Sequence, residues 1–197
     1  MNRTITTTIT TTIATTLWVG LLGAIGAGCG EDADADTTDL PATTVAGHES
    51  GHDDMSITIE GVDYGFTNVP ESVGSGTKLG FSNTSSVELH ELVAFRVDSD
   101  VPLEQLLGLP PAELEATLGA PVTVILQPPG APEPITAVGD GTLAEPGRYV
   151  LMCFIPMGAD PAEYLAAAEA AGGKKPEGVA GGPPHFTAGM VAELTVE

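Results

Sequence analysis

From Ser56 to its C-terminus, the chain is a succession of short apolar segments with β-strand character, bounded by Gly, Pro, Asn and Ser. The segments predicted to form strands are 56–60, 62–66, 78–82, 87–97, 122–127, 135–138, 148–154 and 191–196. Their number is about that of a two-sheet sandwich, which is built around one hydrophobic core. The sequence therefore predicts an all-β domain over residues 56–197.

Two helical segments interrupt the strands. The first runs from Leu103 to Leu118 and is broken at Pro110 and Pro111. The second lies inside a long excursion, residues 155–184, and has the signals of a helix start and end. These are a capping Asp160, proline at the first helical position, an acid three residues after the cap, and Gly172-Gly173 after the Ala-rich run.

The first 28 residues have the features of a signal peptide. Arg3 is followed by a Thr-rich stretch, an apolar run from Ile13 to Ile25 and small residues just before Cys29. The segment ending at Cys29 is similar to a bacterial lipobox, in which the cysteine becomes lipidated, with Gly26 where that pattern prefers Leu, Val or Ile. An ordinary cleaved signal and an uncleaved anchor are the alternatives. All three predict an exported domain, and lipidation would hold it at the cell envelope, in the periplasm or on the cell surface.

Residues 29–55 are rich in Asp, Thr, Ala and Gly without apolar periodicity, which is typical of a disordered acidic linker. His48 and His52 lie there beside Asp53 and Asp54, a spacing that could bind a metal weakly, but the composition favours no fixed site.

The chain after Cys29 is strongly acidic. It carries 27 Asp and Glu against five Lys and Arg, because only Arg3 lies in the leader. This charge excludes nucleic acid as a natural partner and would attract basic proteins or cations, although solubility alone also accounts for it.

Cys153 is the single cysteine left if Cys29 is lipidated, so no disulfide could form within the chain. A lone thiol in an oxidising compartment is either buried and inert or bound to something. Alternation puts Cys153 on one face with Tyr149 and Leu151, and it puts Met190 on the apolar face of the last strand, five residues after His185. If those strands are neighbours, a thiolate, an imidazole and a thioether converge, which is the donor chemistry of copper electron-transfer sites.

Two segments carry a resemblance to a known family. The stretch from Arg148 to Pro156, RYVLMCFIP, and the stretch from Pro184 to Leu194, PHFTAGMVAEL, look like the C-terminal half of the motif of plastocyanin and the copper-resistance cupredoxins. Upstream, FSNT at 81–84 and LHELV at 89–93 are similar to the strand, Asn-rich turn and early histidine of the same family. The chain thus resembles the cupredoxins over about residues 56–197.

The resemblance implies a cupredoxin-like Greek-key β-sandwich with one copper ion, cycling between Cu(I) and Cu(II), in a mononuclear type 1 site. His90, Cys153 and His185 would be the strong equatorial ligands and Met190 the weak axial ligand. The chain departs from the pattern in the long gap from Phe154 to Pro184 and in the residue after the early histidine. That residue is Glu91, where plastocyanins have Asn and copper-resistance cupredoxins often have Glu. Alternation would bury its carboxylate, and a β-bulge at the ligand would relieve this.

Three functions stay open at this point. The first is one-electron transfer by a monomer that docks with a redox partner protein. The second is copper capture and delivery with a copper-handling partner, the excursion acting as a cover. The third is a metal-free binding module with Cys153 as inert core. An enzyme is the least favoured class, because other copper centres need more histidines and no orienting group accompanies a Cys153–His185 dyad.

Overall fold

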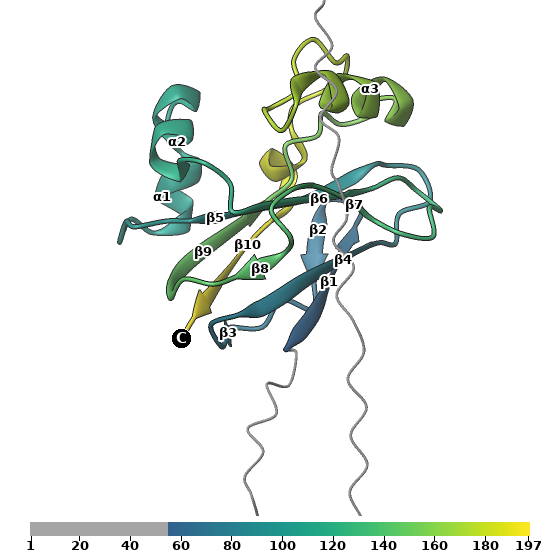
Figure 1. Cartoon of the computed structure of the whole chain (residues 1–197). Helices are drawn as coiled ribbons and strands as arrows, with labels where there is room; N and C mark the ends of the chain where they lie inside the picture. Colours follow the sequence, from purple (N-terminus) through teal and green to yellow (C-terminus); the bar gives the residue numbers. More distant parts are fainter. Residues whose placement is uncertain (1–54) are drawn as a thin grey trace, which may run out of the picture. The chain divides into compact units, whose positions relative to one another are not determined.

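The computed structural model describes residues 55–197, and the predicted signal peptide, Cys29 and the linker up to residue 54 lie outside the described residues. The described chain is mostly β (Figure 1). Its strands are β1 Ser56–Val62, β2 Gly65–Thr67, β3 Ser72–Val73, β4 Thr77–Asn83, β5 His90–Arg96, β6 Thr123–Gln127, β7 Ile135–Val138, β8 Thr142–Leu143, β9 Gly147–Met152 and β10 Val191–Val196. Its helices are α1 Leu103–Leu107, α2 Pro111–Leu118, α3 Pro161–Ala171 and a 3-10 turn, η1, His185–Ala188.

The strands form two sheets that face each other. One has the order β2-β1-β4-β8 and the other β3-β10-β9-β5-β6-β7. The main core lies between them and takes its apolar side chains from both sheets, for example Ile59, Leu79 and Phe81 from the first and Leu92, Leu151 and Leu194 from the second. This arrangement confirms the predicted all-β, cupredoxin-like sandwich.

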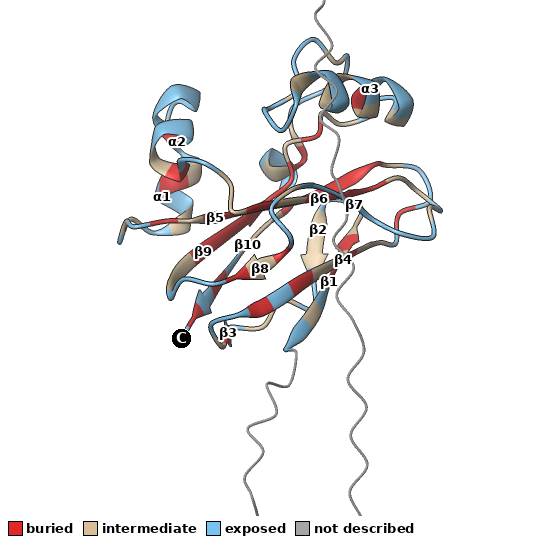
Figure 2. Cartoon of the chain, viewed as in Figure 1, coloured by how far each residue is buried: buried red, intermediate tan, exposed pale blue. Residues whose placement is uncertain are grey.

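The larger sheet is apolar on its outer face as well. Val93, Phe95, Val150 and Met152 point away from the main core and pack with Leu106, Leu114 and Leu118 of α1 and α2. Buried residues therefore follow one another along β5 and the second half of β9, with no alternation of buried and exposed side chains (Figure 2). The helical segment 103–118 is thus present, with its predicted break at Pro110 and Pro111, because its leucines cover this face.

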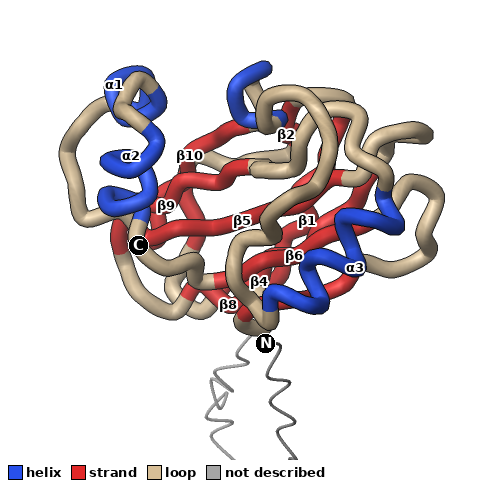
Figure 3. The backbone as a smooth tube through the Cα atoms, turned by 90° about the horizontal axis from the view of Figure 1, so that it is seen from above, coloured by secondary structure: helices blue, strands red, loops and turns tan. Residues whose placement is uncertain are grey.

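Helix α3 confirms the predicted caps. The carboxylate of Asp160 accepts hydrogen bonds from the backbone N–H groups of Ala162 and Glu163, Pro161 is the first helical residue, and Gly172 ends the helix in the left-handed conformation. Seen from above, α3 and the α1–α2 pair lie apart on the molecule (Figure 3). No helix within residues 55–197 is long and apolar enough to span a membrane.

Three local expectations were wrong. The expected strand 62–66 is divided between β1 and β2 by a turn in which Asp63 has φ 35°. The expected strand 87–97 begins only at His90, because Ser85 starts a turn before it. The expected bulge beside His90 does not form: β5 pairs regularly with β6 from His90 to Ala94, and a register shift occurs instead between Val124 and Ile125 in the β6–β7 pairing.

Candidate metal centre

Three donor residues meet at one end of the sandwich, each placed by a different element. His90 is the first residue of β5, Cys153 follows the last residue of β9, and His185 opens η1. Strand β9 lies between β5 and β10, and its Met152 pairs with Val93 on one side and Val191 on the other. The residues that follow β9 and precede β10 therefore meet beside the start of β5.

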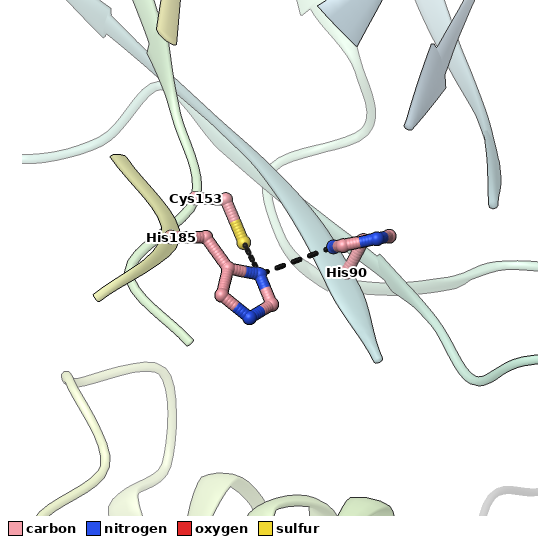
Figure 4. Close-up of side chains that lie close together, drawn as sticks. All are labelled: His90, Cys153 and His185. Atoms are coloured by element: carbon pink, nitrogen blue, oxygen red, sulfur yellow. Dashed lines mark hydrogen bonds between the residues drawn. The ribbon is translucent and has the colours of Figure 1, made fainter. Parts of the chain in front are cut away.

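The donor atoms point toward one another (Figure 4). Nδ1 of His90 lies 3.1 Å from Nδ1 of His185, and Sγ of Cys153 lies 3.4 Å from the same Nδ1 of His185. One ligand atom from each residue lies within 4.8 Å of the others, and all three residues are buried. The structure thus brings together three of the four predicted ligands as a buried group of donors.

The backbone fixes the two loops that carry Cys153 and His185. The N–H of His185 donates to the carbonyl of Ile155 at 3.0 Å, and the N–H of Phe186 donates to the carbonyl of Cys153 at 2.9 Å. Because these bonds cross between the loops, the 31 residues from 154 to 184 can extend outward while their two ends stay together. The long gap therefore does not separate the donors.

Met190, the fourth predicted ligand, is fully buried and shares an apolar cluster with Cys153, Leu89 and Tyr164. Its carbonyl accepts a hydrogen bond from the N–H of Cys153, and its own N–H donates to the carbonyl of His185, both at 3.2 Å. The residue therefore lies directly beside Cys153 and His185. Its neighbour on the other side is Gly61 of β1, whose missing side chain leaves room for the Met190 methyl group.

The burial of the cluster sets the charge state of its members. Burial, with a smaller contribution from His185, lowers the pKa of His90 from 6.5 to about 4, and burial also lowers the pKa of His185. Burial and then the nearby Glu91 raise the pKa of the Cys153 thiol well above 9. In the metal-free protein at neutral pH, both imidazoles are neutral and offer a lone pair, while the thiol needs a cation to ionise it.

The cluster fits a metal ion held through the two Nδ1 atoms and Sγ. Metal bonds of about 2.0 to 2.3 Å at tetrahedral angles keep ligand atoms about 3.3 to 3.6 Å apart, close to the 3.1 Å and 3.4 Å that separate Nδ1 of His185 from the other two donor atoms. Ligation at Nδ1 puts the imidazole proton on Nε2, and the Nε2 atoms of His90 and His185 are buried without a hydrogen-bond partner among the described residues. Two imidazoles, one thiolate and a neighbouring thioether suit one copper ion in both oxidation states.

All three donors are buried, and none of them lines the cavity of about 590 Å³ on the outer face of the larger sheet. The lining of that cavity includes Val124 of β6, Leu118 of α2 and Lys174 of the 155–184 segment. His185 is covered instead by the ring of Tyr64, whose centroid lies 5.1 Å from that of the imidazole at an interplanar angle of 72°, and by Glu88.

Glu91 and Glu88 are the acids that contact the site. The carboxylate of Glu91 lies on the outer face of β5, where it accepts hydrogen bonds from the Phe154 N–H at 3.0 Å and the Tyr164 hydroxyl at 3.1 Å. These bonds, and not a bulge, accommodate its burial. Burial raises its pKa from 4.5 to about 7. Glu88 was not predicted as a site residue from the sequence, and its position two residues before His90 is the only signal that could have indicated it.

No family model matches the sequence, and no curated protein matches it at a significant level. Among solved structures, the chain is similar to the dithionite-reduced auracyanin of the photosynthetic bacterium Roseiflexus castenholzii, with 22% identity and a TM-score of 0.41, covering 73% of this chain and 97% of that one. It is also similar to auracyanin A, a blue copper protein of Chloroflexus aurantiacus, with 17% identity and a TM-score of 0.42, covering 73% and 98%. For auracyanin B the identity is 16%, the TM-score 0.34 and the coverage 73% and 88%.

Because these scores are low, the assignment rests on the chain's own features. Two facing sheets enclose one main core, and β5, the end of β9 and the start of η1 carry a buried His–Cys–His cluster at one end of the sandwich. The chain therefore has the cupredoxin-like fold that its sequence predicts, with a donor cluster suited to one copper ion.

Proposed function

We propose that the protein is a mononuclear copper protein that transfers single electrons, with His90, Cys153 and His185 as the strong ligands and Met190 as the weak one. The observation that carries the proposal is the convergence of the Nδ1 atoms of His90 and His185 with the thiol of Cys153, three donors that the sequence separates widely but the fold gathers within 4.8 Å. Copper would supply a one-electron couple between Cu(I) and Cu(II).

The protein's own contribution is a site that holds its donors in place. His90 is fixed by the β5–β6 and β5–β9 pairings, and Cys153 and His185 are fixed by the hydrogen bonds between their loops. Since these restraints are backbone bonds of the sandwich, they do not depend on the charge of the ion. A ligand set that stays in place in both oxidation states keeps the reorganisation on electron transfer small.

The decisive experiment is a titration of residues 29–197 with Cu(II), followed by absorption and EPR spectroscopy, beside a Cys153→Ser variant. An intense visible thiolate-to-copper band that is absent from Cys153→Ser is expected. Met157→Leu is the matched control, because Met157 lies in the 155–184 segment outside the proposed ligand set. A protein that binds neither Cu(II) nor Cu(I) would contradict the proposal and favour a metal-free binding module.

Copper capture and delivery is the second candidate, and the burial of His185 favours it. The imidazole is fully buried beneath Tyr64, Glu88 and the start of the 155–184 segment, so no ligand edge reaches solvent directly. A cover of this kind suits retention of the ion. A very high Cu(I) affinity, together with direct transfer to a copper-handling protein and slow electron exchange, would select this function over electron transfer.

The surroundings of the protein are part of the proposal. The signal-peptide features and Cys29 support export and lipid anchoring at the cell envelope, which mass spectrometry of the membrane fraction would test through a diacylglyceryl modification at Cys29. The acidic chain supports a basic redox or copper-handling partner.

The neutral, high-pKa thiol of the metal-free site argues against a nucleophilic Cys153–His185 dyad and so against an enzyme of that class.

A further inference from the structure

His185 has one ring nitrogen left over when its Nδ1 is turned toward Cys153 and His90. That atom, Nε2, is buried and has no hydrogen-bond partner among residues 55–197. A carboxylate oxygen, Oε2 of Glu88, lies 3.6 Å away. If Nδ1 binds a metal, as in the proposed function on which this inference rests, the proton must sit on Nε2, facing Glu88.

We propose that Glu88 is the positioning residue of His185: its carboxylate, 3.6 Å from Nε2 in the metal-free structure, becomes the hydrogen-bond acceptor of the Nε2–H group when Nδ1 binds the metal, orients the imidazole toward the metal and strengthens it as a donor. A carboxylate or carbonyl acceptor on the far nitrogen of a ligand histidine fixes its tautomer and raises its basicity. The negative charge also favours the more highly charged oxidation state of a bound ion.

Hydrogen bonds fix the backbone of Glu88 next to the site. The Ser85 hydroxyl accepts hydrogen bonds from the N–H groups of Val87 at 3.2 Å and Glu88 at 3.0 Å. The side-chain amide of Asn83 donates to the Glu88 carbonyl at 2.8 Å. Both backbone groups of Glu88 are therefore used, and the turn 85–88 holds the residue at the entrance to β5.

The side chain of Glu88 is held from two further directions. The Tyr64 hydroxyl donates to Oε1 at 3.5 Å, and the N–H of Gly158 donates to Oε2 at 3.2 Å. Gly158 belongs to the 155–184 segment, so the carboxylate connects that segment to the ligand His185. The segment has a role in this arrangement: it fixes the acceptor that orients the ligand.

Glu88→Gln tests the proposal because it keeps the shape of the side chain and removes its charge. In the copper-loaded protein we expect the thiolate-to-copper band to remain and the reduction potential to rise above that of the wild type. Glu88→Ala should raise the potential and also speed the loss of Cu(I) to a bicinchoninate chelator several-fold. Glu113→Gln, on the exposed surface of α2, removes one charge elsewhere and should leave both quantities unchanged.

A second measurement needs no metal. Amide hydrogen exchange at Gly158 should be faster in metal-free Glu88→Ala than in the wild type, because the amide loses its acceptor. If Glu88→Ala does not fold, Tyr64→Phe removes the hydroxyl that donates to Oε1 of Glu88 and should raise the reduction potential by a smaller amount.

The outcomes separate this inference from the proposed function. A wild type without a copper band would overturn the proposed function. A wild type with the band, beside a Glu88→Gln variant whose potential equals that of Glu113→Gln, would overturn the role of Glu88 and leave the proposed function standing.

Discussion

The Nδ1 atoms of His90 and His185 lie 3.1 Å apart although 95 residues separate them in the sequence. Two neutral imidazoles at this distance can share one proton in a hydrogen bond, which uses both Nδ1 atoms, so a cation that binds both Nδ1 atoms and the thiol of Cys153 would have to displace this proton. The two histidines are also fully buried, so protonation of either imidazole would place a charge away from water at a cost in free energy. This pairing links the metal site to the stability of the metal-free protein.

The first prediction concerns that stability and its pH dependence. The pKa of His90 falls from 6.5 to about 4 on folding, so the unfolded chain binds a proton that the folded chain does not, and stability falls as pH falls from 6.5 to 4. The pKa of Glu91 rises from 4.5 to about 7, so the folded chain keeps a proton that the unfolded chain releases, and stability falls as pH rises from 4.5 to 7. The two effects oppose each other between pH 4.5 and 6.5.

Glu91→Gln should separate these effects, because glutamine imitates the protonated acid and can still accept from the Phe154 N–H. Between pH 5 and pH 8 the metal-free wild type should lose about 2 to 3 kcal/mol relative to Glu91→Gln. Urea unfolding at several pH values measures this difference, with Glu113→Gln as the control that should run parallel to the wild type. Parallel curves for Glu91→Gln and the wild type would show that Glu91 is ionised in the folded state.

The second prediction concerns the reactivity of Cys153. Because burial raises the pKa of its thiol, Cys153 in the metal-free folded protein, with Cys29 replaced by serine, should react with a disulfide reagent such as dithiobisnitrobenzoate many times more slowly at pH 8 than in the urea-unfolded chain. The release of the coloured thiolate measures both rates. Rapid labelling of the folded protein at pH 7 would instead indicate a thiolate activated by His185, the pairing expected of a nucleophilic enzyme.

Much of the fold was predictable because local chemistry determines it. Helix α3 begins and ends where the sequence predicts, since Asp160, Pro161 and Gly172 each act within a few residues. Strands β9 and β10 are neighbours, which is the condition that the sequence set for the convergence of Cys153, His185 and Met190. The strands that escaped prediction, β3 and β8, have two residues each, too few for any alternation to show.

The surroundings of the donors could not be predicted in the same way. Glu91 is buried because Tyr164, 73 residues away, reaches over it from α3, and no local pattern encodes that contact. Glu88 and Tyr64 cover His185 only because the turn between β1 and β2 meets the turn before β5. The types of the ligands follow from the sequence, whereas the groups that adjust them depend on how the 155–184 segment folds back on the sandwich.

The third prediction concerns the attachment of that segment. Tyr164 is the single buried residue of α3, and its hydroxyl donates to Glu91. Tyr164→Phe keeps the ring but leaves a buried carboxyl oxygen without its donor, at a cost of about 1 to 3 kcal/mol. Amide exchange should accelerate across α3 in this variant more than in β5.

Tyr149→Phe is the matched control for Tyr164→Phe. It removes a hydroxyl that donates to the Glu145 carbonyl at 2.8 Å, away from α3. It should lower the global stability without a selective increase in exchange across α3. Equal exchange patterns in the two variants would contradict the view that Tyr164 anchors the helix.

The last prediction concerns the space around Met190. Gly61 of β1 faces this residue, and a Cβ there would lie 2.8 Å from Cζ of Phe81 and 3.2 Å from Cε of Met190. Gly61→Ala should therefore push both side chains and cost about 1 to 3 kcal/mol, the usual range for overpacking. Gly74→Ala is the control, because its nearest contact is Met55 at 3.5 Å.

If Met190 is the weak axial ligand, Gly61→Ala should also alter the copper spectrum, since axial ligation adjusts the potential and the bands of such sites. Met190→Leu removes the thioether at similar volume and should raise the potential while His90, Cys153 and His185 retain the ion. Both variants are measured by absorption spectroscopy and voltammetry of the copper-loaded protein. A Met190→Leu variant with the potential and bands of the wild type would exclude Met190 as a ligand, and the effect of Gly61→Ala would then be one of packing alone.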